Sequence, residues 1–168
     1  NDFSVLHFNI RSISKKIDSL SFLLDNCNFN CSVIGLTETW LAESSPLLYS
    51  IPGFDFVTNN RENKRGGGVA LYVSHKFNHK PIPQLSFMTA SLESVFLEIT
   101  IPNQKNIVIG VIYRPPHSSI SDFLQGMQDI LSNPVLHRKT CFIMGDFNLI
   151  FLITPMIYSS VHDLLDLM

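Results

Sequence analysis

The sequence predicts an α/β sandwich with mixed sheets, and three observations lead to this fold class. Short runs of strand-forming residues alternate along the chain with two amphipathic helical patterns. The strand runs are apolar enough to be covered on both faces. In the middle of the chain, two further runs are separated by a short polar turn, which is typical of a hairpin.

Length and composition fit a single domain. The chain has 168 residues, of which 45% are hydrophobic, and a net charge of −2. The apolar content suffices for a core, and the near-neutral charge argues against a passive nucleic-acid-binding module. Cys27, Cys31 and Cys141 lie in or beside apolar runs without four-ligand zinc spacing. We therefore expect reduced thiols in a reducing compartment.

The chain opens with a predicted strand followed by a helix. Residues 3–9 are rich in strand formers and stop at the polar Asn9. After Ser12 the apolar period becomes helical, and either Ser12 or Ser14 is expected to cap this helix. The apolar positions of the helix are Ile13, Ile17, Leu20 and Leu24.

A second strand is predicted over residues 31–36. The run CSVIGL is continuously apolar, which is typical of a strand buried on both faces. Glu38 follows it as an acidic group at a strand end, and the single tryptophan, Trp40, comes next. Taken alone, Glu38 fits a solvated loop acid equally well, and Trp40 fits a core anchor.

Residues 42–66 are predicted to form a loop because they contain prolines, a glycine and a polar run. Arg61, Lys64 and Arg65 form the only local cluster of positive charge. This cluster is a candidate for phosphate contact, and the alternative is a solvated surface loop.

Glycines mark the entry to the middle of the chain. Residues 66–68 are three glycines that lead into a strand over 69–74, which suits close backbone packing or a bulge. A P-loop is disfavoured because no Gly-Lys-Ser/Thr follows. After a proline-rich connection, residues 94–101 and 107–113 are predicted to pair as a hairpin.

The second strand of this hairpin ends at Tyr113. Arg114 and two prolines follow, and the prolines stiffen the exit and fix the direction of both side chains. Residues 118–132 then show a second amphipathic pattern, with Ser119 or Ser121 as the expected helix cap.

The stretch CFIMGDFN reads as a strand that stops at a polar edge. Residues 141–144 are apolar and predict a buried strand, and Gly145 permits a tight turn. Asp146 and Asn148 then lie at the carboxyl end of the strand, where ligands bind in open α/β sheets. The alternative for this stretch is an Asx turn that caps the strand.

Polar side chains therefore follow four predicted strands, at Asn9, Glu38, Tyr113, and the pair Asp146 and Asn148. If these ends meet, the site is rich in oxygen and lacks the nitrogen and sulfur ligands that zinc prefers. Such a set suits a hard cation such as Mg²⁺. A divalent ion facing phosphate also removes the need for a basic protein.

Five motifs in this order resemble the endonuclease/exonuclease/phosphatase superfamily, and in particular the apurinic-like endonuclease domain of non-LTR (LINE-type) retrotransposons. They are NIRS at Asn9, TETW at Glu38, RGGGVALYV from Arg65, YRPP at Tyr113 and GDFN at Asp146. The resemblance implies a DNase-I-like two-sheet α/β sandwich. It also implies cleavage of a DNA phosphodiester bond with Mg²⁺ or Mn²⁺, which nicks the target site.

The resemblance also implies roles for single residues. Glu38 is expected to be the principal metal ligand, supported by Asn9. Asp146 is expected to orient or deprotonate the attacking water. Asn148 would hold Asp146 or the phosphate, and Tyr113 would donate to a phosphate oxygen in the transition state.

Two arginines are weaker candidates for contact with the substrate phosphate, namely Arg114 and Arg65. The expected partners are a DNA substrate and, downstream in a full-length element, a reverse transcriptase domain; the oligomeric state is left open. No signal peptide and no apolar run near 18 residues is present. We therefore expect an intracellular protein, nuclear or cytoplasmic, without membrane contact, that begins partway into a longer reading frame.

The C-terminus departs from the family pattern. We expect residues 1–148 to be an incomplete domain and residues 149–168 a divergent apolar tail. Family members add strands after GDFN and close with a Ser-Asp-His motif, whereas His162-Asp163 has the reversed order and comes too early. Lacking those strands and that histidine, the chain is expected to show weak or no activity.

Two alternatives stay open for the function. One is a degenerate relative that binds but does not cut. The other is a superfamily phosphatase or phosphodiesterase that acts on a small phosphoester, such as an inositol phosphate or sphingomyelin.

Overall fold

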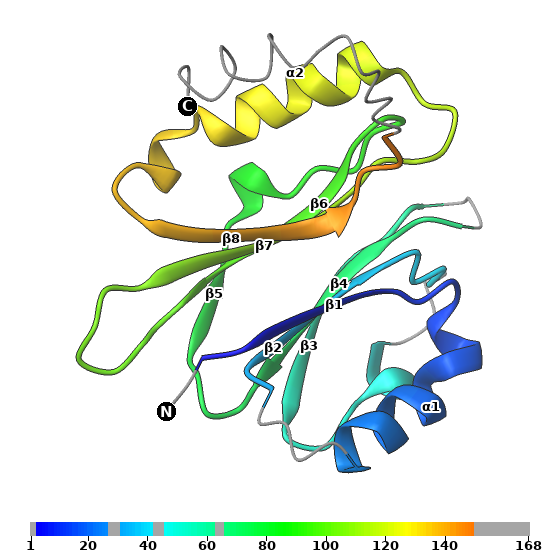
Figure 1. The fold of residues 1–168 in the computed structure, drawn as a ribbon, viewed down its shortest axis with the longest axis vertical. Helices are drawn as coiled ribbons and strands as arrows, with labels where there is room; N and C mark the ends of the chain where they lie inside the picture. Colours follow the sequence, from blue (N-terminus) through cyan, green and yellow to red (C-terminus); the bar gives the residue numbers. More distant parts are fainter. Residues whose placement is uncertain (1–2, 27–30, 42–45, 63–65, 150–168) are drawn as a thin grey trace, which may run out of the picture.

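Two four-stranded sheets form the fold, which a computed structural model describes over residues 3–26, 31–41, 46–62 and 66–149. The first sheet has the order β1-β2-β4-β3 and the second the order β5-β6-β7-β8 (Figure 1). The strands are β1 (Val5–Asn9), β2 (Val33–Thr37), β3 (Phe54–Asn59), β4 (Val69–Ser74), β5 (His79–Pro81), β6 (Glu93–Ile99), β7 (Ile107–Tyr113) and β8 (Thr140–Asp146). The helices are α1 (Ile13–Asn26), α2 (Ile120–Leu131) and the short η1 (Pro46–Tyr49), η2 (Pro83–Leu85) and η3 (Pro134–Leu136).

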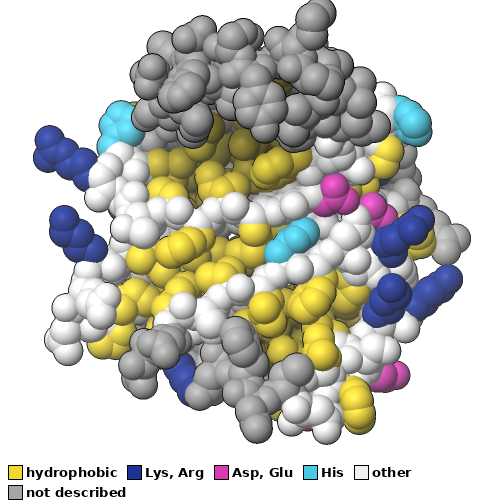
Figure 2. All heavy atoms as spheres, in the orientation of Figure 1, with side chains coloured by type: hydrophobic (Ala, Val, Ile, Leu, Met, Phe, Trp, Pro, Cys, Tyr) yellow, Lys and Arg dark blue, Asp and Glu magenta, His cyan; other side chains and the backbone are white. Residues whose placement is uncertain are grey.

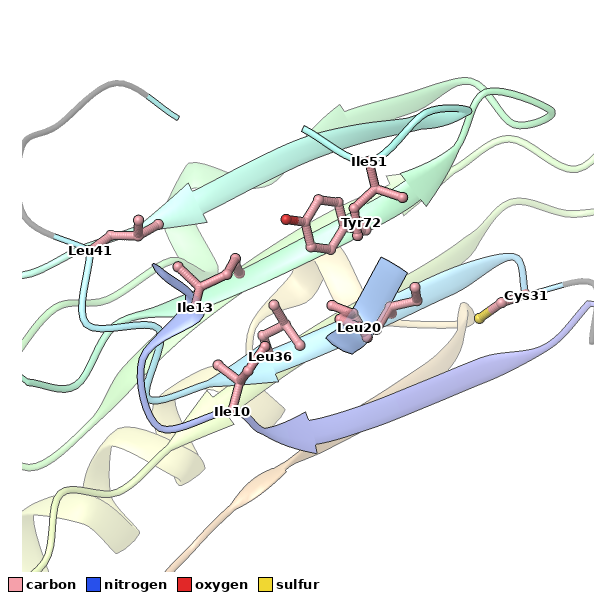
Figure 3. Close-up of a cluster of buried hydrophobic side chains, with 10 residues drawn as sticks. Ile10, Ile13, Leu20, Cys31, Leu36, Leu41, Ile51 and Tyr72 are labelled. Atoms are coloured by element: carbon pink, nitrogen blue, oxygen red, sulfur yellow. The ribbon is translucent and has the colours of Figure 1, made fainter. Parts of the chain in front are cut away.

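The two sheets lie face to face, with α1 on the outer face of one and α2 on the outer face of the other (Figure 1). Three apolar clusters fill the layers. Under α1, the side chains of Ile13 and Leu20 pack with Leu36 (Figure 3). Under α2, Phe123 packs with Phe96. The third cluster joins the sheets and contains Val33, Leu71, Val73, Val95, Leu97, Ile109 and Val111. The predicted two-sheet α/β sandwich is confirmed.

The side chains of β2 alternate between the two faces of its sheet, and both faces are covered. Val33 faces the other sheet, whereas Ile34 and Leu36 face α1, and every residue of the strand is buried. This confirms the prediction of a strand covered on both faces. β2 pairs with β1 in parallel and with β4 antiparallel, so the sheet is mixed.

The second sheet is also mixed. β6 and β7 form the predicted antiparallel hairpin, and β8 pairs in parallel with β7 after the α2 crossover. The hydroxyl of Ser119 accepts from the Asp122 backbone N–H at 3.2 Å, so Ser119 is the cap of α2. α1 begins at Ile13, directly after Ser12.

The prediction of a loop over residues 42–66 is wrong, because this range contains η1 and the strand β3. Phe54 and Phe56 alternate along β3 and pack against the cluster under α1, where Phe56 stacks on Tyr72 at 4.3 Å between ring centroids. The neighbouring proline and glycine hid this two-residue period. The connection before residue 83 likewise contains the short strand β5, whose Pro81 the antiparallel pairing accommodates at its end.

The prediction of a buried strand at residues 141–144 is also wrong in part. β8 is a strand, but it lies at the edge of its sheet, and none of its residues is buried. Phe142 is 46% exposed. β1 is the corresponding end strand of the other sheet, and apolar side chains gather along both strands on the face shown in Figure 2.

Cys31 and Cys141 are free thiols, as predicted, and Cys27 lies outside the described residues. Across those same parts of the chain, no helix is long and apolar enough to cross a membrane. The predicted tail is outside the described part from residue 150 onward, and with it His162 and Asp163.

Gly145→Ala is expected to destabilise the fold. Gly145 pairs with Ile112 across β7 and β8, and a methyl group there would overlap the backbone oxygen of Ile112. Because backbone cannot move aside as a side chain can, we expect a loss of about 1–3 kcal/mol in the free energy of unfolding by urea.

The matched control is Gly126→Ala in α2. There the added methyl meets only the Leu92 side chain at 3.0 Å, and alanine favours the helix by about 1 kcal/mol. This variant should differ little from the wild type. Equal urea midpoints for the two variants would contradict the close approach at Gly145.

Candidate active site

The carboxyl ends of β1, β2, β7 and β8 meet at one edge of the sandwich, and this brings three predicted residues into contact. The Asn9 side-chain amide donates to Glu38 Oε1 at 2.9 Å and to Asp146 Oδ2 at 2.7 Å. Asn9 ends β1 of the first sheet, Glu38 directly follows β2 of the same sheet, and Asp146 ends β8 of the second. A single amide therefore joins the two sheets.

The two carboxylates carry like charges and converge on one small donor. Arg11 is the nearest cation recorded for Glu38, at 3.9 Å, and its side chain is 72% exposed. A hard cation with oxygen ligands would relieve this repulsion, so Glu38 and Asp146 fit a Mg²⁺ or Mn²⁺ ion.

Within the described ranges, no group of three or more His, Cys, Asp and Glu side chains is arranged to hold a metal. Water and a substrate phosphate would complete the shell of such an ion, as is usual for Mg²⁺. Figure 2 shows acidic side chains grouped near the right-hand end of β8, next to basic ones.

Tyr113 lies beside the carboxylates and is 3% exposed. Burial, followed by the charges of Glu38 and Glu93 and a hydrogen bond with Glu38, raises the pKa of Tyr113 above its usual value. The phenol is therefore protonated at neutral pH and can act as a hydrogen-bond donor. This is the state that the predicted role requires.

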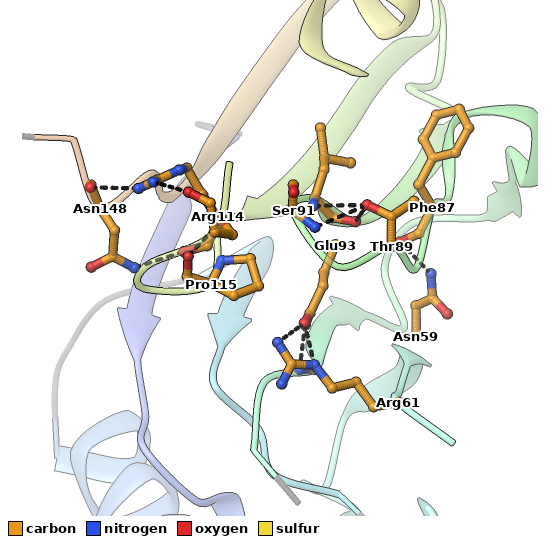
Figure 4. Close-up of polar contacts among 12 residues, drawn as sticks. Asn59, Arg61, Phe87, Thr89, Ser91, Glu93, Arg114, Pro115 and Asn148 are labelled. Atoms are coloured by element: carbon orange, nitrogen blue, oxygen red, sulfur yellow. Dashed lines mark hydrogen bonds and ion pairs between the residues drawn. The ribbon is translucent and has the colours of Figure 1, made fainter. Parts of the chain in front are cut away.

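Asn148 and Arg114 clamp the segment that follows β8 (Figure 4). Arg114 donates from Nη1 to the Asn148 carbonyl at 2.8 Å and from Nη2 to the Ser118 carbonyl at 2.6 Å. In return, the Asn148 amide donates to the Arg114 carbonyl at 2.8 Å. The Asn148 backbone N–H donates to Asp146 Oδ1 at 3.1 Å, so the clamp orients the Asp146 carboxylate.

This arrangement bears on the candidates for phosphate contact. Arg114 is 5% exposed and is tied to backbone carbonyls, which suits a clamp better than a phosphate ligand. Arg65 lies outside the described residues, as does Lys64. Arg61, from the same predicted basic cluster, is paired with Glu93.

Sequence reasoning missed Glu93 and His7. Glu93 opens β6 opposite Tyr113 and is fully buried, although a glutamate at a strand start is usually solvated. His7 precedes Asn9 by two residues on β1, and its Nε2 lies 3.3 Å from Thr37 Oγ1. Burial lowers the pKa of His7, which the charge of Asp146 opposes. The alternation of β1 could have placed His7 on the same face as Asn9.

Backbone strain gathers around the same edge. Glu38 has φ 56°, Trp40 has φ 54° and Asn148 has φ 47°, and Arg11 and Ser12 also have positive φ. Such conformations cost about 1–3 kcal/mol each outside glycine and persist only where the surroundings impose them. Their gathering here points to a site that is shaped for function.

The sequence and the fold resemble known proteins. A model of the Endonuclease/Exonuclease/phosphatase family matches residues 6–152. No curated protein matches the sequence. The endonuclease domain of TRAS1, a telomere-specific non-LTR retrotransposon, is similar with a TM-score of 0.66 and 17% identity, over 89% of this chain and 61% of that one.

Two further solved structures are similar. The Xenopus laevis APE2 catalytic domain has a TM-score of 0.61 at 15% identity, over 93% of this chain and 63% of that one. D. rerio TDP2, complexed with a single-strand DNA product, has 0.59 at 13% identity, with 89% and 62% covered. The chain thus spans about three fifths of the length of these structures, and at such identities the likeness concerns the fold.

Arg114→Met is expected to lower the free energy of unfolding by about 1–3 kcal/mol, because two partly buried carbonyls lose a charged donor. Arg11→Met is the matched control, since Arg11 is exposed and its ion pair is long. Urea denaturation measures both. If Arg114→Met were as stable as Arg11→Met, the clamp would have no energetic importance.

Tyr113→Phe is expected to flatten the loss of stability at high pH. Folding raises the pKa of the phenol, so its contribution is complete below the unfolded pKa of about 10 and is lost as the pH rises above it. Between pH 10 and 11.5 the wild type should lose up to about 1.4 kcal/mol more per pH unit than the variant. Urea denaturation at several pH values tests this, and parallel curves would contradict it.

Proposed function

Because the chain belongs to the endonuclease/exonuclease/phosphatase family, we propose that it is a metal-dependent phosphodiesterase that nicks DNA. The observation that carries this proposal is the Asn9 amide, which holds the carboxylates of Glu38 and Asp146 together at the meeting strand ends. The family model spans both residues. Such a pair serves hydrolysis of a phosphodiester bond when a divalent cation is present.

Each residue of the site has a part in this proposal. Glu38 holds the cation, with Asn9 in support, and the chemistry that a bound Mg²⁺ or Mn²⁺ supplies is charge stabilisation at the phosphate. Asp146 accepts a proton from the attacking water. Asn148 keeps the Asp146 carboxylate in place, and Tyr113 donates its phenolic proton in a hydrogen bond to a phosphate oxygen.

The likeness to a retrotransposon endonuclease domain supports a finer proposal. The nick is made in target DNA during retrotransposition, and a reverse transcriptase domain follows this domain in the full-length element. Such a protein works inside the cell, in the nucleus or cytoplasm. The motif resemblance over residues 9–148 and the TRAS1 fold support this assignment together.

In a complete domain, Glu38→Gln and Asp146→Asn are expected to reduce plasmid nicking by about 10²–10³-fold each, because each removes one charge from the site. Circular dichroism first establishes that each chain is folded. Relaxation of supercoiled plasmid is then followed with Mg²⁺, with Mn²⁺ and with chelator. Asp129→Asn, an exposed change on α2, is the matched control and should retain wild-type nicking.

The outcomes separate the alternatives. Nicking that survives in both site variants, or that does not need a metal ion, contradicts the proposal. A folded chain that binds plasmid without nicking it supports the degenerate relative. Hydrolysis of an inositol phosphate or sphingomyelin without nicking supports the small-phosphoester alternative.

A further inference from the structure

Glu93 is a fully buried carboxylate at the start of β6, and the function proposed above gives it no role. Its Oε2 accepts from the Gly68 backbone N–H at 2.6 Å, and its Oε1 is paired with the Arg61 guanidinium (Figure 4). The Arg61 side chain is itself only 16% exposed. A buried charge is tolerated only when it is paired and hydrogen-bonded. The pair of Glu93 and Arg61 is therefore a fixed part of the fold.

The glycines beside the pair allow three chain segments to touch. Gly67 and Gly68 have φ values of 67° and 86°, which glycine adopts without strain. A methyl group at Gly67 would lie 2.5 Å from the Arg61 guanidinium and 2.6 Å from Glu93 Oε1, and one at Gly68 would overlap the Thr39 hydroxyl. The glycine segment therefore fills the space between the ion pair and the loop that carries Glu38.

Backbone hydrogen bonds complete this connection. Thr39 N–H donates to the Gly68 carbonyl at 3.2 Å, and Trp40 N–H donates to the Gly67 carbonyl at 2.9 Å. On the other side, the Glu38 carbonyl accepts from Ser12 N–H at 2.9 Å. Residues 38–40 are thus held from two sides in the strained conformation that turns Glu38 toward Asn9.

We propose that Arg61 and Glu93 are positioning residues, which fix the glycine segment and through it the direction of the Glu38 carboxylate. The effect on the metal site rests on the function proposed above, whereas the effect on the backbone of residues 38–40 does not. Arg61 accordingly serves the site from inside the fold and does not contact phosphate at the surface.

Glu93→Gln and Arg61→Met test this, with Glu98→Gln as the matched control. Glu98 lies on the same strand and pairs with Lys139 at 3.0 Å, far along β6 from the glycine segment. Hydrogen exchange of the Thr39 and Trp40 amides is the first readout. We expect faster exchange at these amides in the two test variants, by a larger factor than at α2 amides, and no such difference in the control.

Affinity for Mg²⁺ is the second readout, measured by fluorescence of Trp40, the only tryptophan in the chain. We expect the two test variants to bind Mg²⁺ about 10–100-fold more weakly than the wild type, the range for residues that orient metal ligands. The control should bind as the wild type does.

Each outcome decides the proposal. Unchanged exchange at Thr39 and Trp40, or an equal rise at these amides and at α2, overturns it. If the wild type does not bind Mg²⁺, the proposed function fails while the exchange result still decides the positioning role. If Glu93→Gln and Arg61→Met do not fold, Arg61→Lys replaces them; it keeps the charge but loses the planar fork, and unchanged exchange in it overturns the proposal.

Discussion

The apolar layer between the two sheets is the constraint on which the site depends. Val33 and Leu71 of one sheet pack with Val95 and Val111 of the other, and this contact fixes how the sheets lie across each other. Only with that packing do the ends of β1 and β8 come close enough for one amide to reach two carboxylates. A buried apolar layer thus sets the distances between side chains at the polar edge.

Two separate sets of interactions, which differ in chemistry, stabilise the polar edge. Arg114 secures Asn148 and Asp146 through hydrogen bonds to backbone carbonyls. On the other side, Glu93 and Arg61 meet the glycine segment through a buried ion pair. Both sets of interactions place a buried charge just behind the site, where the low dielectric strengthens the hydrogen bonds and the ion pair. The positive φ angles at Glu38 and Asn148 persist because these contacts hold them.

Much of the fold and of the candidate site could be predicted from the sequence, because the strands have clear apolar patterns and polar ends. β2 and β7 are continuous apolar runs with polar ends, which fixes their positions, and the cap of α2 at Ser119 follows from the residue type that precedes the helical pattern. β3 could not be predicted, because Phe54 and Phe56 alternate with polar residues in an end strand beside turn-forming residues. The clamp at Arg114 was hidden for another reason: its partners are main-chain carbonyls, which every residue carries.

The bond between Asn9 and Asp146 joins residues 137 positions apart, and this separation governs when the site exists. During synthesis, β1 and β2 emerge with half of the acidic pair long before β8 is made. Closing so long a loop carries an entropic cost that later contacts must offset, and contacts of this kind form late in folding. A ribosome-bound chain therefore holds no assembled acidic pair until it has passed β8. The proposed active centre therefore exists only once the two sheets have docked.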